Sequence, residues 1–344
     1  MTRSILICLS VATFWLPLFV STLESAEPDK GLTFLDPNEA GPDFAVQGEY
    51  VGTIGDGTKL GAQVVALGNG RFDAVLYARG LPGDGWDGKL RVHLNGETVD
   101  ANVEEVVAGQ EATAGKESLT IFKGKNFDGT IRQGRFSGTA DRDVTFELHK
   151  VERKSPTLGA QPPEGALVLF DGSGTDAWDN GRQTADKLLG VGTRTHKKFR
   201  DFTLHLEFRT PFMPLARGQD RGNSGMYLLD QYECQVLDSF GLAGKDNECG
   251  GIYKIAKPKF NMCFPPLSWQ TYDVEFQAAS FNDSGEKTAN ALVTIRHNGV
   301  AIHEDLVLPR FTPGGLQDDE RPGALYLQNH RNPVHFRNIW IVEN

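Results

Sequence analysis

The sequence predicts an all-β protein in which a smaller β-rich domain precedes a C-terminal two-sheet sandwich. Turn-forming residues recur at short intervals, because the 344 residues include 39 glycines and 17 prolines. The stretches between the turns alternate apolar and polar residues with period two, which is the pattern of half-buried strands. No long stretch shows the 3.6-residue period of an amphipathic helix, so helices are not expected to build the core.

The first residues are typical of an export signal. Arg3 precedes an apolar run over residues 5–20, and small and polar residues follow around Ala26. This pattern predicts a signal peptide over residues 1–26 and therefore a periplasmic or secreted protein. A retained N-terminal anchor is the alternative, although Pro17 interrupts the run. No later segment is long and apolar enough to span a membrane after cleavage.

The charge of the chain argues against two classes of partner. The formal net charge is −10, and no Lys/Arg-rich block occurs. Nucleic acids and anionic membranes are bound through clustered positive charge, so neither is expected as a partner.

Two blocks of predicted strands are separated by a proline-rich segment. Residues 36–152 contain alternating stretches such as GAQVVAL and KLRVHLNG between tight turns, and they are expected to form a β-rich accessory domain. Residues 153–165, RKSPTLGAQPPEG, are poor in apolar side chains and contain three prolines, which predicts a linker.

Residues 166–344 carry stronger strand signals. In FTLHLEFRT, Phe202, Leu204, Leu206 and Phe208 share one face, and polar side chains share the other. An Asn-Gly pair at residues 298–299 predicts a hairpin turn between two further strands. Strands with one apolar face, repeated over this length, predict a sandwich in which each sheet buries its apolar side.

Three cysteines follow the predicted cleavage site. Cys249 and Cys263 lie in Gly- and Pro-rich loop sequence, and Cys234 lies on the apolar face of a strand. In an exported protein this pattern predicts a Cys249–Cys263 disulfide and a buried free thiol at Cys234. A zinc site is the alternative, but it is disfavoured because no Cys-x2-Cys spacing and no flanking His occur.

The polar faces of the predicted strands suggest a carbohydrate site. The stretch YECQVLD puts Glu233 and Gln235 on one face of its strand, and Asp238 follows. Tyr, His, Gln, Asn and Arg prevail on these faces, and such side chains hydrogen-bond sugars or cover their apolar faces. Glu233 and His330 are the candidate catalytic residues. The candidate substrate-binding residues are Arg209, Asn223, Gln235, Asp238, Tyr326, Gln328 and Arg337.

Structural roles compete with this interpretation. Glu207 and Arg209 are equally consistent with a cross-strand ion pair, and Arg337 is consistent with a bridge between strands. A lone histidine such as His205 is more often a solvated strand residue than part of a site.

Eight stretches of residues 166–344 resemble a known family in their order. They are LFDGSGTDAW, FTLHLEFRT, RGNSGMYL, YECQVLD, GGIYK, SWQTYDVEF, RHNG and GALYLQNHRNPVHFRNIWI. The set is similar to that of the 3-keto-disaccharide hydrolase domain family, whose fold is a concanavalin-like sandwich, or jelly roll. The resemblance implies action on glycosides whose sugar carries a ketone at carbon 3, and a partner sugar 3-dehydrogenase that makes the ketone. It does not cover the first block, which is similar to accessory domains of exported bacterial proteins.

The spacing of the acids helps to choose between two kinds of glycoside cleavage. A retaining glycosidase needs two carboxyl groups about 5 to 5.5 Å apart. Asp238 is five positions after Glu233, so a regular strand places the two on opposite faces. A 3-keto sugar needs only one base, because the ketone acidifies the hydrogen on carbon 2. Glu233 or His330 is the expected base, and the enolate that forms would expel the group on carbon 1.

Other parts of the mechanism, and the choice of function, stay open at this point. The enolate needs a positive or hydrogen-bonding group, and Arg209 or Arg337 is expected to supply it. A divalent metal held by Glu233 and His330 is left open, and no further cofactor is assigned. Two other functions compete with an enzyme: a lectin-like carbohydrate-binding module, and a structural or adhesion protein that binds through its first block.

Overall fold

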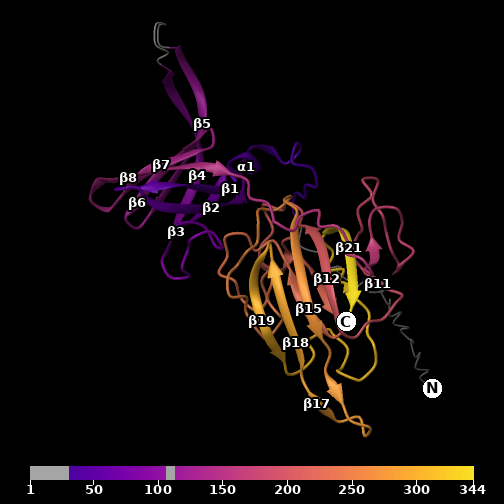
Figure 1. Ribbon diagram of the computed structural model, residues 1–344. Coiled ribbons are helices and arrows are strands. Elements are labelled where there is room, and N and C mark those ends of the chain that lie inside the picture. The colour runs from indigo at the N-terminus through magenta and orange to yellow at the C-terminus, as the bar shows by residue number, and fades with distance from the viewer. Residues whose placement is uncertain (1–30, 106–112) are drawn as a thin grey trace, which may run out of the picture.

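The computed structural model describes residues 31–105 and 113–344, so the predicted signal peptide at residues 1–26 lies outside the described residues. Almost all regular structure in the described part is β-strand, which confirms the predicted all-β fold. The strands form two bodies that lie end to end, a barrel from the first block and a sandwich from the second (Figure 1). The short helical segments are α1 (Gly41–Val46), η1 (Asp141–Asp143) and η2 (Gly218–Asp220).

The first block is an antiparallel barrel whose strands follow one another in sequence order. The strands are β1 (Gly48–Ile54), β2 (Thr58–Gly68), β3 (Arg71–Ala78), β4 (Arg91–Glu105), β5 (Thr113–Gly124), β6 (Phe127–Arg132), β7 (Arg135–Ala140) and β8 (Val144–Val151). β1 pairs with both β2 and β8, which closes the barrel. Inward-pointing side chains fill it. The largest of them are Tyr50, Phe72, Phe122, Phe136 and Phe146.

The second block is a sandwich of two antiparallel sheets, as predicted. Its strands are β9 (Leu167–Phe170), β10 (Trp178–Asp179), β11 (Thr193–Thr195), β12 (Phe202–Arg209), β13 (Ser224–Leu228), β14 (Tyr232–Val236), β15 (Gln270–Gln277), β16 (Ser280–Phe281), β17 (Lys287–Ala289), β18 (Ala291–His297), β19 (Val300–Leu308), β20 (Tyr326–Leu327) and β21 (His335–Glu343). The six-stranded sheet has the order β19-β18-β15-β12-β21-β9, and the five-stranded sheet has the order β10-β11-β20-β13-β14. β16 and β17 form a separate small hairpin.

The alternation of side chains decides what lies between the two sheets. Leu204 and Leu206 of β12 are fully buried in the core, which they share with Cys234 of β14. Burial of each such leucine contributes about 1.5–3 kcal/mol to folding. Glu207 follows Leu206 and Glu233 precedes Cys234, so each points away from the core of its own sheet. The two glutamates therefore lie on opposite outer faces of the sandwich.

The predicted linker, residues 153–165, is a strap that packs on the outer face of the six-stranded sheet. It contains no strand or helix, as its composition predicts. The N–H of Gly159 donates to Glu207 Oε1 at 2.5 Å, and the carbonyl oxygen of Ala160 accepts from Trp340 Nε1 at 3.2 Å. The strap is therefore fixed to the sheet, because its polar groups find partners there rather than in water.

The barrel and the sandwich bury side chains in each other. Phe212 and Leu267 of the sandwich belong to the core cluster of the barrel, and Val65 of the barrel belongs to the core cluster of the sandwich. Arg153 donates to both oxygens of the buried Glu49 carboxylate, at 2.7 and 2.6 Å. These contacts hold the two bodies in one arrangement.

The structure contains free thiols where the sequence predicted a disulfide, so that prediction is wrong. Cys249 and Cys263 are both free, and both are buried in the sandwich core rather than on surface loops. Cys249 Sγ lies 3.3 Å from Tyr272 Oη, and Cys263 Sγ lies 3.5 Å from the carbonyl oxygen of Leu237. Loop composition does not distinguish an exposed loop from one that packs inward. Cys234 is a buried free thiol, as predicted.

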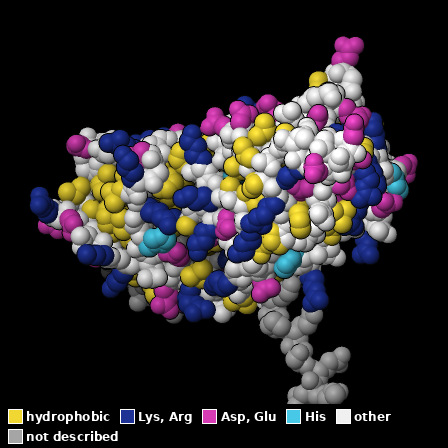
Figure 2. Space-filling view, turned by 90° about the horizontal axis from the view of Figure 1, so that it is seen from below, with side chains coloured by type: hydrophobic (Ala, Val, Ile, Leu, Met, Phe, Trp, Pro, Cys, Tyr) yellow, Lys and Arg dark blue, Asp and Glu magenta, His cyan; other side chains and the backbone are white. Residues whose placement is uncertain are grey.

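No helix within residues 31–105 and 113–344 has the length and apolar character needed to cross a membrane. On the face shown in Figure 2, Lys and Arg side chains are interspersed with Asp and Glu side chains.

Candidate active site

A row of four side chains crosses the outer face of the five-stranded sheet, and we call it the Glu233 row. Arg194 of β11 is in register with Tyr326 of β20. Tyr326 is in register with Tyr227 of β13, which is in register with Glu233 of β14. Residues in register point to the same face, so the four stand side by side. The Arg194 guanidinium lies 3.9 Å from the centre of the Tyr326 ring, and the two tyrosine rings are 5.4 Å apart.

Glu233 is an enclosed carboxyl group at one end of this row. It is only 3% exposed, and the Tyr227 hydroxyl donates to its Oε2 at 3.0 Å. Its backbone N–H donates to Thr312 Oγ1 at 2.9 Å, which fixes the strand at this point. Burial raises the pKa of Glu233 to about 7, and the hydrogen bond from Tyr227 offsets only part of this effect. A carboxyl group with such a pKa can take up and release a proton near neutral pH.

A glycine next to Glu233 makes room for its carboxylate. Gly225 of β13 is in register with Gln235 of β14. A Cβ atom at Gly225 would lie 2.3 Å from Glu233 Oε1, so any side chain there would displace the carboxylate. The N–H of Gln328 donates to the Gly225 carbonyl oxygen at 2.8 Å. The Glu233 carboxylate therefore lies over Gly225, between Gln235 and Gln328.

Amide side chains surround the Glu233 carboxylate, and some of their oxygens lack a hydrogen-bond partner. Gln328 Nε2 donates to Tyr227 Oη, and Gln235 Nε2 donates to Gln219 Oε1, each at 3.3 Å. Among the residues that the structure describes, Gln328 Oε1, Gln235 Oε1 and Asn223 Oδ1 are buried without a hydrogen-bond partner. Such atoms cost free energy, so these amide groups favour a ligand that brings hydroxyl donors.

The structure brings together one predicted catalytic residue and four predicted binding residues. They are Glu233, Asn223, Gln235, Tyr326 and Gln328. His330 is exposed after β20, and its side chain makes no hydrogen bond or ion pair with Glu233 in the described part of the chain. Its catalytic role stays a prediction without a contact that supports it.

The two predicted arginines belong to the other sheet, which corrects their assignment to this site. Arg209 of β12 and Arg337 of β21 are in the six-stranded sheet, on the outer face opposite to that of Glu233. Their guanidinium groups lie 5.0 and 3.9 Å from the centre of the Trp269 ring. Arg337 Nε also donates to Glu207 Oε2 at 2.7 Å. Alternation along a strand shows that a side chain points outward, but it does not show to which of the two sheets the strand belongs.

Asp238 is also corrected as a substrate-binding residue. β14 ends at Val236, and the Asp238 carboxylate accepts from Arg221 Nε at 2.6 Å. The Asp238 side chain is 1% exposed, and Arg221 Nη1 donates to the carbonyl oxygen of Ala66 in the barrel. The carboxylate is therefore held at the boundary between barrel and sandwich and is not free for a sugar.

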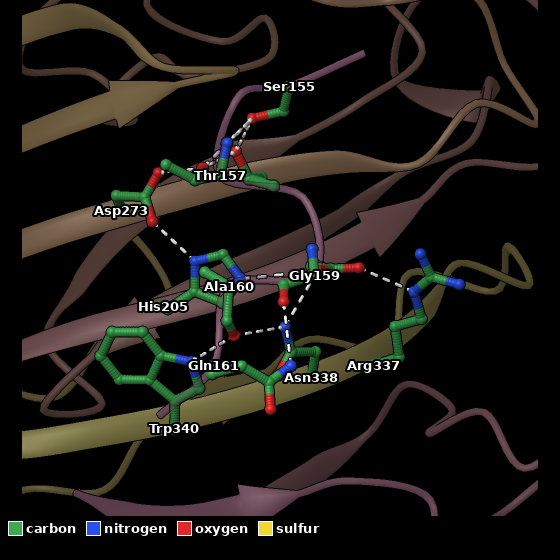
Figure 3. Close-up of polar contacts among 12 residues, drawn as sticks. Ser155, Thr157, Gly159, Ala160, Gln161, His205, Asp273, Arg337, Asn338 and Trp340 are labelled. Carbon is green, nitrogen blue, oxygen red and sulfur yellow. Dashed lines mark hydrogen bonds and ion pairs between the residues drawn. The ribbon is translucent and has the colours of Figure 1, made fainter. Parts of the chain in front are cut away.

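A second polar cluster lies beneath the strap, on the outer face of the six-stranded sheet (Figure 3). His205 Nδ1 lies 2.6 Å from Asp273 Oδ1, and its Nε2 lies 3.6 Å from Glu207 Oε1. Thr157 of the strap donates to Asp273 Oδ2 at 2.7 Å, and Asn338 Nδ2 donates to Glu207 Oε1 at 2.9 Å. Most polar groups here are paired with one another, which is typical of a structural network that fastens the strap.

The charges of this network define a pH range of stability. Burial alone would lower the pKa of His205, but hydrogen bonds to Asp273 and Glu207 outweigh it and raise the pKa above 6.5. Burial would raise the pKa of Glu207, but hydrogen bonds led by that from His205 lower it from 4.5 to about 2. The His205 contribution is complete below pH 6.5 and is lost as the pH rises through the raised pKa. The Glu207 contribution is complete above pH 4.5 and is lost as the pH falls toward 2.

We therefore expect the stabilisation by this network to be greatest between about pH 4.5 and 6.5. In acid, the free energy of unfolding should fall by about 3 kcal/mol, because this is the free energy that corresponds to the lowered pKa of Glu207. Denaturant unfolding of the wild type and of His205→Gln over this range and beyond it measures the difference. His196→Gln, at an exposed histidine beside Asp179, is the matched control. An equal difference between wild type and His205→Gln at every pH would contradict the assignment.

A divalent metal held by Glu233 and His330 stays an open prediction. In the described ranges no group of three or more His, Cys, Asp or Glu side chains is arranged to hold a metal ion. His330 makes no hydrogen bond or ion pair with Glu233 in these ranges.

The sequence-based list of site residues missed four residues. Arg194 lies in the three-residue strand β11, which is too short for its alternation to be recognised. Gln219 lies in the short helix η2, outside any strand. Gly225 could have been predicted from RGNSGMYL, because a glycine inside a strand often indicates that another group approaches the backbone closely. Tyr227, two residues later, has the outward parity of its neighbours and orients the carboxylate.

A cleft of about 630 Å³ lies elsewhere, where the barrel meets the strap and the start of β15. Among its lining residues are Phe44, Gln47, Lys150, Leu158 and Trp269. It contains no residue of the Glu233 row, so this cleft is separate from the row.

Comparisons with known proteins agree with this division of the chain. A family model described as the 3-keto-alpha-glucoside-1,2-lyase-like domain matches residues 165–342, which confirms the predicted resemblance. A crystal structure of a candidate glycosyl hydrolase from Parabacteroides distasonis ATCC 8503 is 31% identical, with 53% of this chain and 85% of that chain covered and a TM-score of 0.48. Another from the same organism is 18% identical, with coverages of 53% and 94% and a TM-score of 0.37. No curated protein matches.

The family match includes the whole sandwich core and every residue of the Glu233 row, and it supports a carbohydrate-active function. Because it spans more than half of the 344 residues, the chain belongs to the family of 3-keto-alpha-glucoside-1,2-lyase-like domain proteins.

Proposed function

We propose that the protein is an exported enzyme that cleaves 3-keto-glycosides, with Glu233 as the base that removes the hydrogen on carbon 2. The observation that carries this proposal is the enclosed Glu233 carboxyl group, which lies over Gly225 among amide side chains and has a pKa of about 7. Family membership supports the substrate class, since the description of the family names a 3-keto-glucoside and a 1,2-lyase reaction.

The chemistry needs one base and no second carboxylate. The Glu233 carboxylate takes the proton from carbon 2, and the electrons of that C–H bond form an enolate with the oxygen on carbon 3. The enolate then restores the ketone, forms a double bond between carbons 1 and 2, and expels the oxygen on carbon 1. That oxygen takes a proton from Glu233 or from water. The products are an alcohol and an unsaturated 3-keto sugar, and addition of water to the double bond would complete a net hydrolysis.

The neighbours of Glu233 suit the charge that develops. The Tyr227 hydroxyl donates to the ionised carboxylate, and once Glu233 has taken the proton this hydroxyl can donate to the enolate oxygen instead, supported by the Gln328 amide that donates to Tyr227 Oη. They take the role that the sequence assigned to the two arginines. Tyr326 and Arg194 continue the row across two further strands, and neighbouring strands are about 4.8 Å apart. The row is therefore long enough to contact the leaving group as well as the sugar.

Export and a partner enzyme are parts of the same proposal. The sequence of residues 1–26 supports a periplasmic or secreted location. A sugar 3-dehydrogenase must supply the ketone, because a hydroxyl on carbon 3 does not acidify the hydrogen on carbon 2.

The test is release of the aglycone from a 3-keto-glucoside and from its unoxidised parent, followed in deuterated water. We expect release from the keto form only, with deuterium at carbon 2 of the hydrated sugar product or of recovered substrate. Release from the parent at an equal rate would overturn the proposal. Binding without release from either would instead identify a lectin-like module, in which Glu233 and Gln235 only recognise the sugar.

A further inference from the structure

A loop of the sandwich that ends beside the Glu233 row is held by the barrel through two arginines. Arg217 Nη2 donates to the carbonyl oxygen of Leu67 at 2.6 Å, and Arg221 Nη1 donates to that of Ala66 at 3.1 Å. Both acceptors are at the end of β2, in consecutive residues. The backbone approach is close, because a Cβ atom at Gly68 would lie 2.4 Å from Leu215 Cδ2. The barrel thus contacts residues 214–221 at several points.

Gln219 lies between the two arginines in sequence and connects this loop to the outer face of the five-stranded sheet, which carries the Glu233 row. Its backbone oxygen accepts from Asn223 Nδ2 at 2.7 Å. Its Oε1 accepts from Asn223 Nδ2 and from Gln235 Nε2, each at 3.3 Å. Its own Nε2 donates to the carbonyl oxygen of Asn247 at 2.8 Å, which fixes the orientation of the Gln219 amide.

These contacts determine which way two amide groups of the face are turned. Gln219 holds the nitrogens of Asn223 and Gln235, so in each amide the oxygen points away from Gln219. Those oxygens, Asn223 Oδ1 and Gln235 Oε1, are the buried acceptors that have no partner in the described residues. With Gln219 displaced, either amide could rotate and present nitrogen in place of oxygen.

We infer that the barrel is a positioning element for substrate recognition: Arg217 and Arg221 hold Gln219, and Gln219 turns Asn223 and Gln235 so that both accept hydrogen bonds from hydroxyl groups of a sugar. This inference rests on the proposed function, and it gives the barrel a role in that function. Arg217 and Arg221 touch neither the reacting atoms nor the sugar, so they are positioning residues.

The variant that tests this is Arg217→Ala in the full chain. Arg217 is exposed, so its loss should not unfold the protein. We expect KM for a 3-keto-glucoside to rise about tenfold, as loss of one oriented hydrogen bond would produce, while kcat changes less than about twofold. Arg217→Lys should recover part of the effect, because an ammonium group can still donate to Leu67. Arg135→Ala, an exposed arginine of the barrel that pairs with Glu147, is the control and should leave KM unchanged.

A double-mutant cycle with Gln219→Ala separates this role from a general loss of structure. If Arg217 acts through Gln219, then Arg217→Ala should have no further effect on KM in the Gln219→Ala background. An unchanged KM in Arg217→Ala, or effects of the two substitutions that multiply fully, would overturn the inference.

A second readout keeps the inference distinct from the proposed reaction. Hydrogen exchange of the backbone amides of residues 217–224 should be faster in Arg217→Ala than in the wild type and in Arg135→Ala. If the wild type releases no aglycone, the proposed reaction is wrong, but the exchange rates still test the positioning role of Arg217. Equal exchange rates in all three proteins would overturn that positioning role.

Discussion

Glu233→Gln is expected to lower kcat on a 3-keto-glycoside by about 10²–10⁴-fold, the usual effect of removing a general base. The amide keeps the volume of the side chain and can still accept from Tyr227, so KM should change little. Steady-state kinetics on the purified protein measure both constants. A kcat within a few-fold of wild type would remove Glu233 from the mechanism.

The pH profile gives this prediction an independent check. Wild-type kcat/KM should rise with pH through about 7, because the base must be ionised and the pKa of Glu233 is about 7. Tyr227→Phe removes the hydrogen bond that lowers this pKa, so the rise should move to higher pH. His330→Ala is the parallel test of the other predicted base. A loss in His330→Ala as large as that in Glu233→Gln would assign the proton transfer to His330 as well.

Arg221→Met is expected to lower the free energy of unfolding by about 3–5 kcal/mol, since it leaves a buried charge without its partner. The side chains of Arg221 and Asp238 are 6% and 1% exposed, and they meet between the barrel and the sandwich. Denaturant unfolding followed by circular dichroism measures the change, together with whether the two bodies still unfold in one transition.

Two controls show whether the unpaired charge is the cause. The double variant Arg221→Met with Asp238→Leu removes both charges and should recover most of the loss. Arg194→Met breaks a more exposed ion pair with Asp230 and should cost about 1 kcal/mol or less. A double variant no more stable than Arg221→Met alone would show that the loss comes from packing or from the bond to Ala66.

Alternation along the chain predicted the inward and outward side chains of the long strands. It placed Phe202, Leu204, Leu206 and Phe208 in the core, where the structure has them. It also placed Glu233 and Gln235 together on the outside of the core. The periodicity is a local property that follows from the pleat, so one strand is enough to reveal it.

What the sequence did not reveal depends on contacts between distant segments. Arg337 and Glu233 both point outward, but pairing assigns their strands to different sheets. The strap has the composition of a free linker, yet Thr157 and Gly159 have acceptors on β15 and β12. Cys249 lies in a loop that packs into the core. In each case the position of the residue depends on a partner that is many residues away in the chain, and a local sequence pattern contains no information about that partner.

The place of the last strand in the six-stranded sheet has a consequence for the order of folding. β21, the final nine-residue strand, lies between β12 and the edge strand β9, so β9 has no partner and β12 has only β15 until the end of the chain has been made. Every pairing in the barrel, by contrast, is complete once residue 151 is available. Synthesis from the N-terminus therefore allows the barrel to close while the six-stranded sheet still lacks β21, whose pairings with β12 and β9 have a long sequence separation and are slow to form. Limited proteolysis of chains stalled before residue 335 would detect a protected barrel joined to a sandwich that is still open to cleavage.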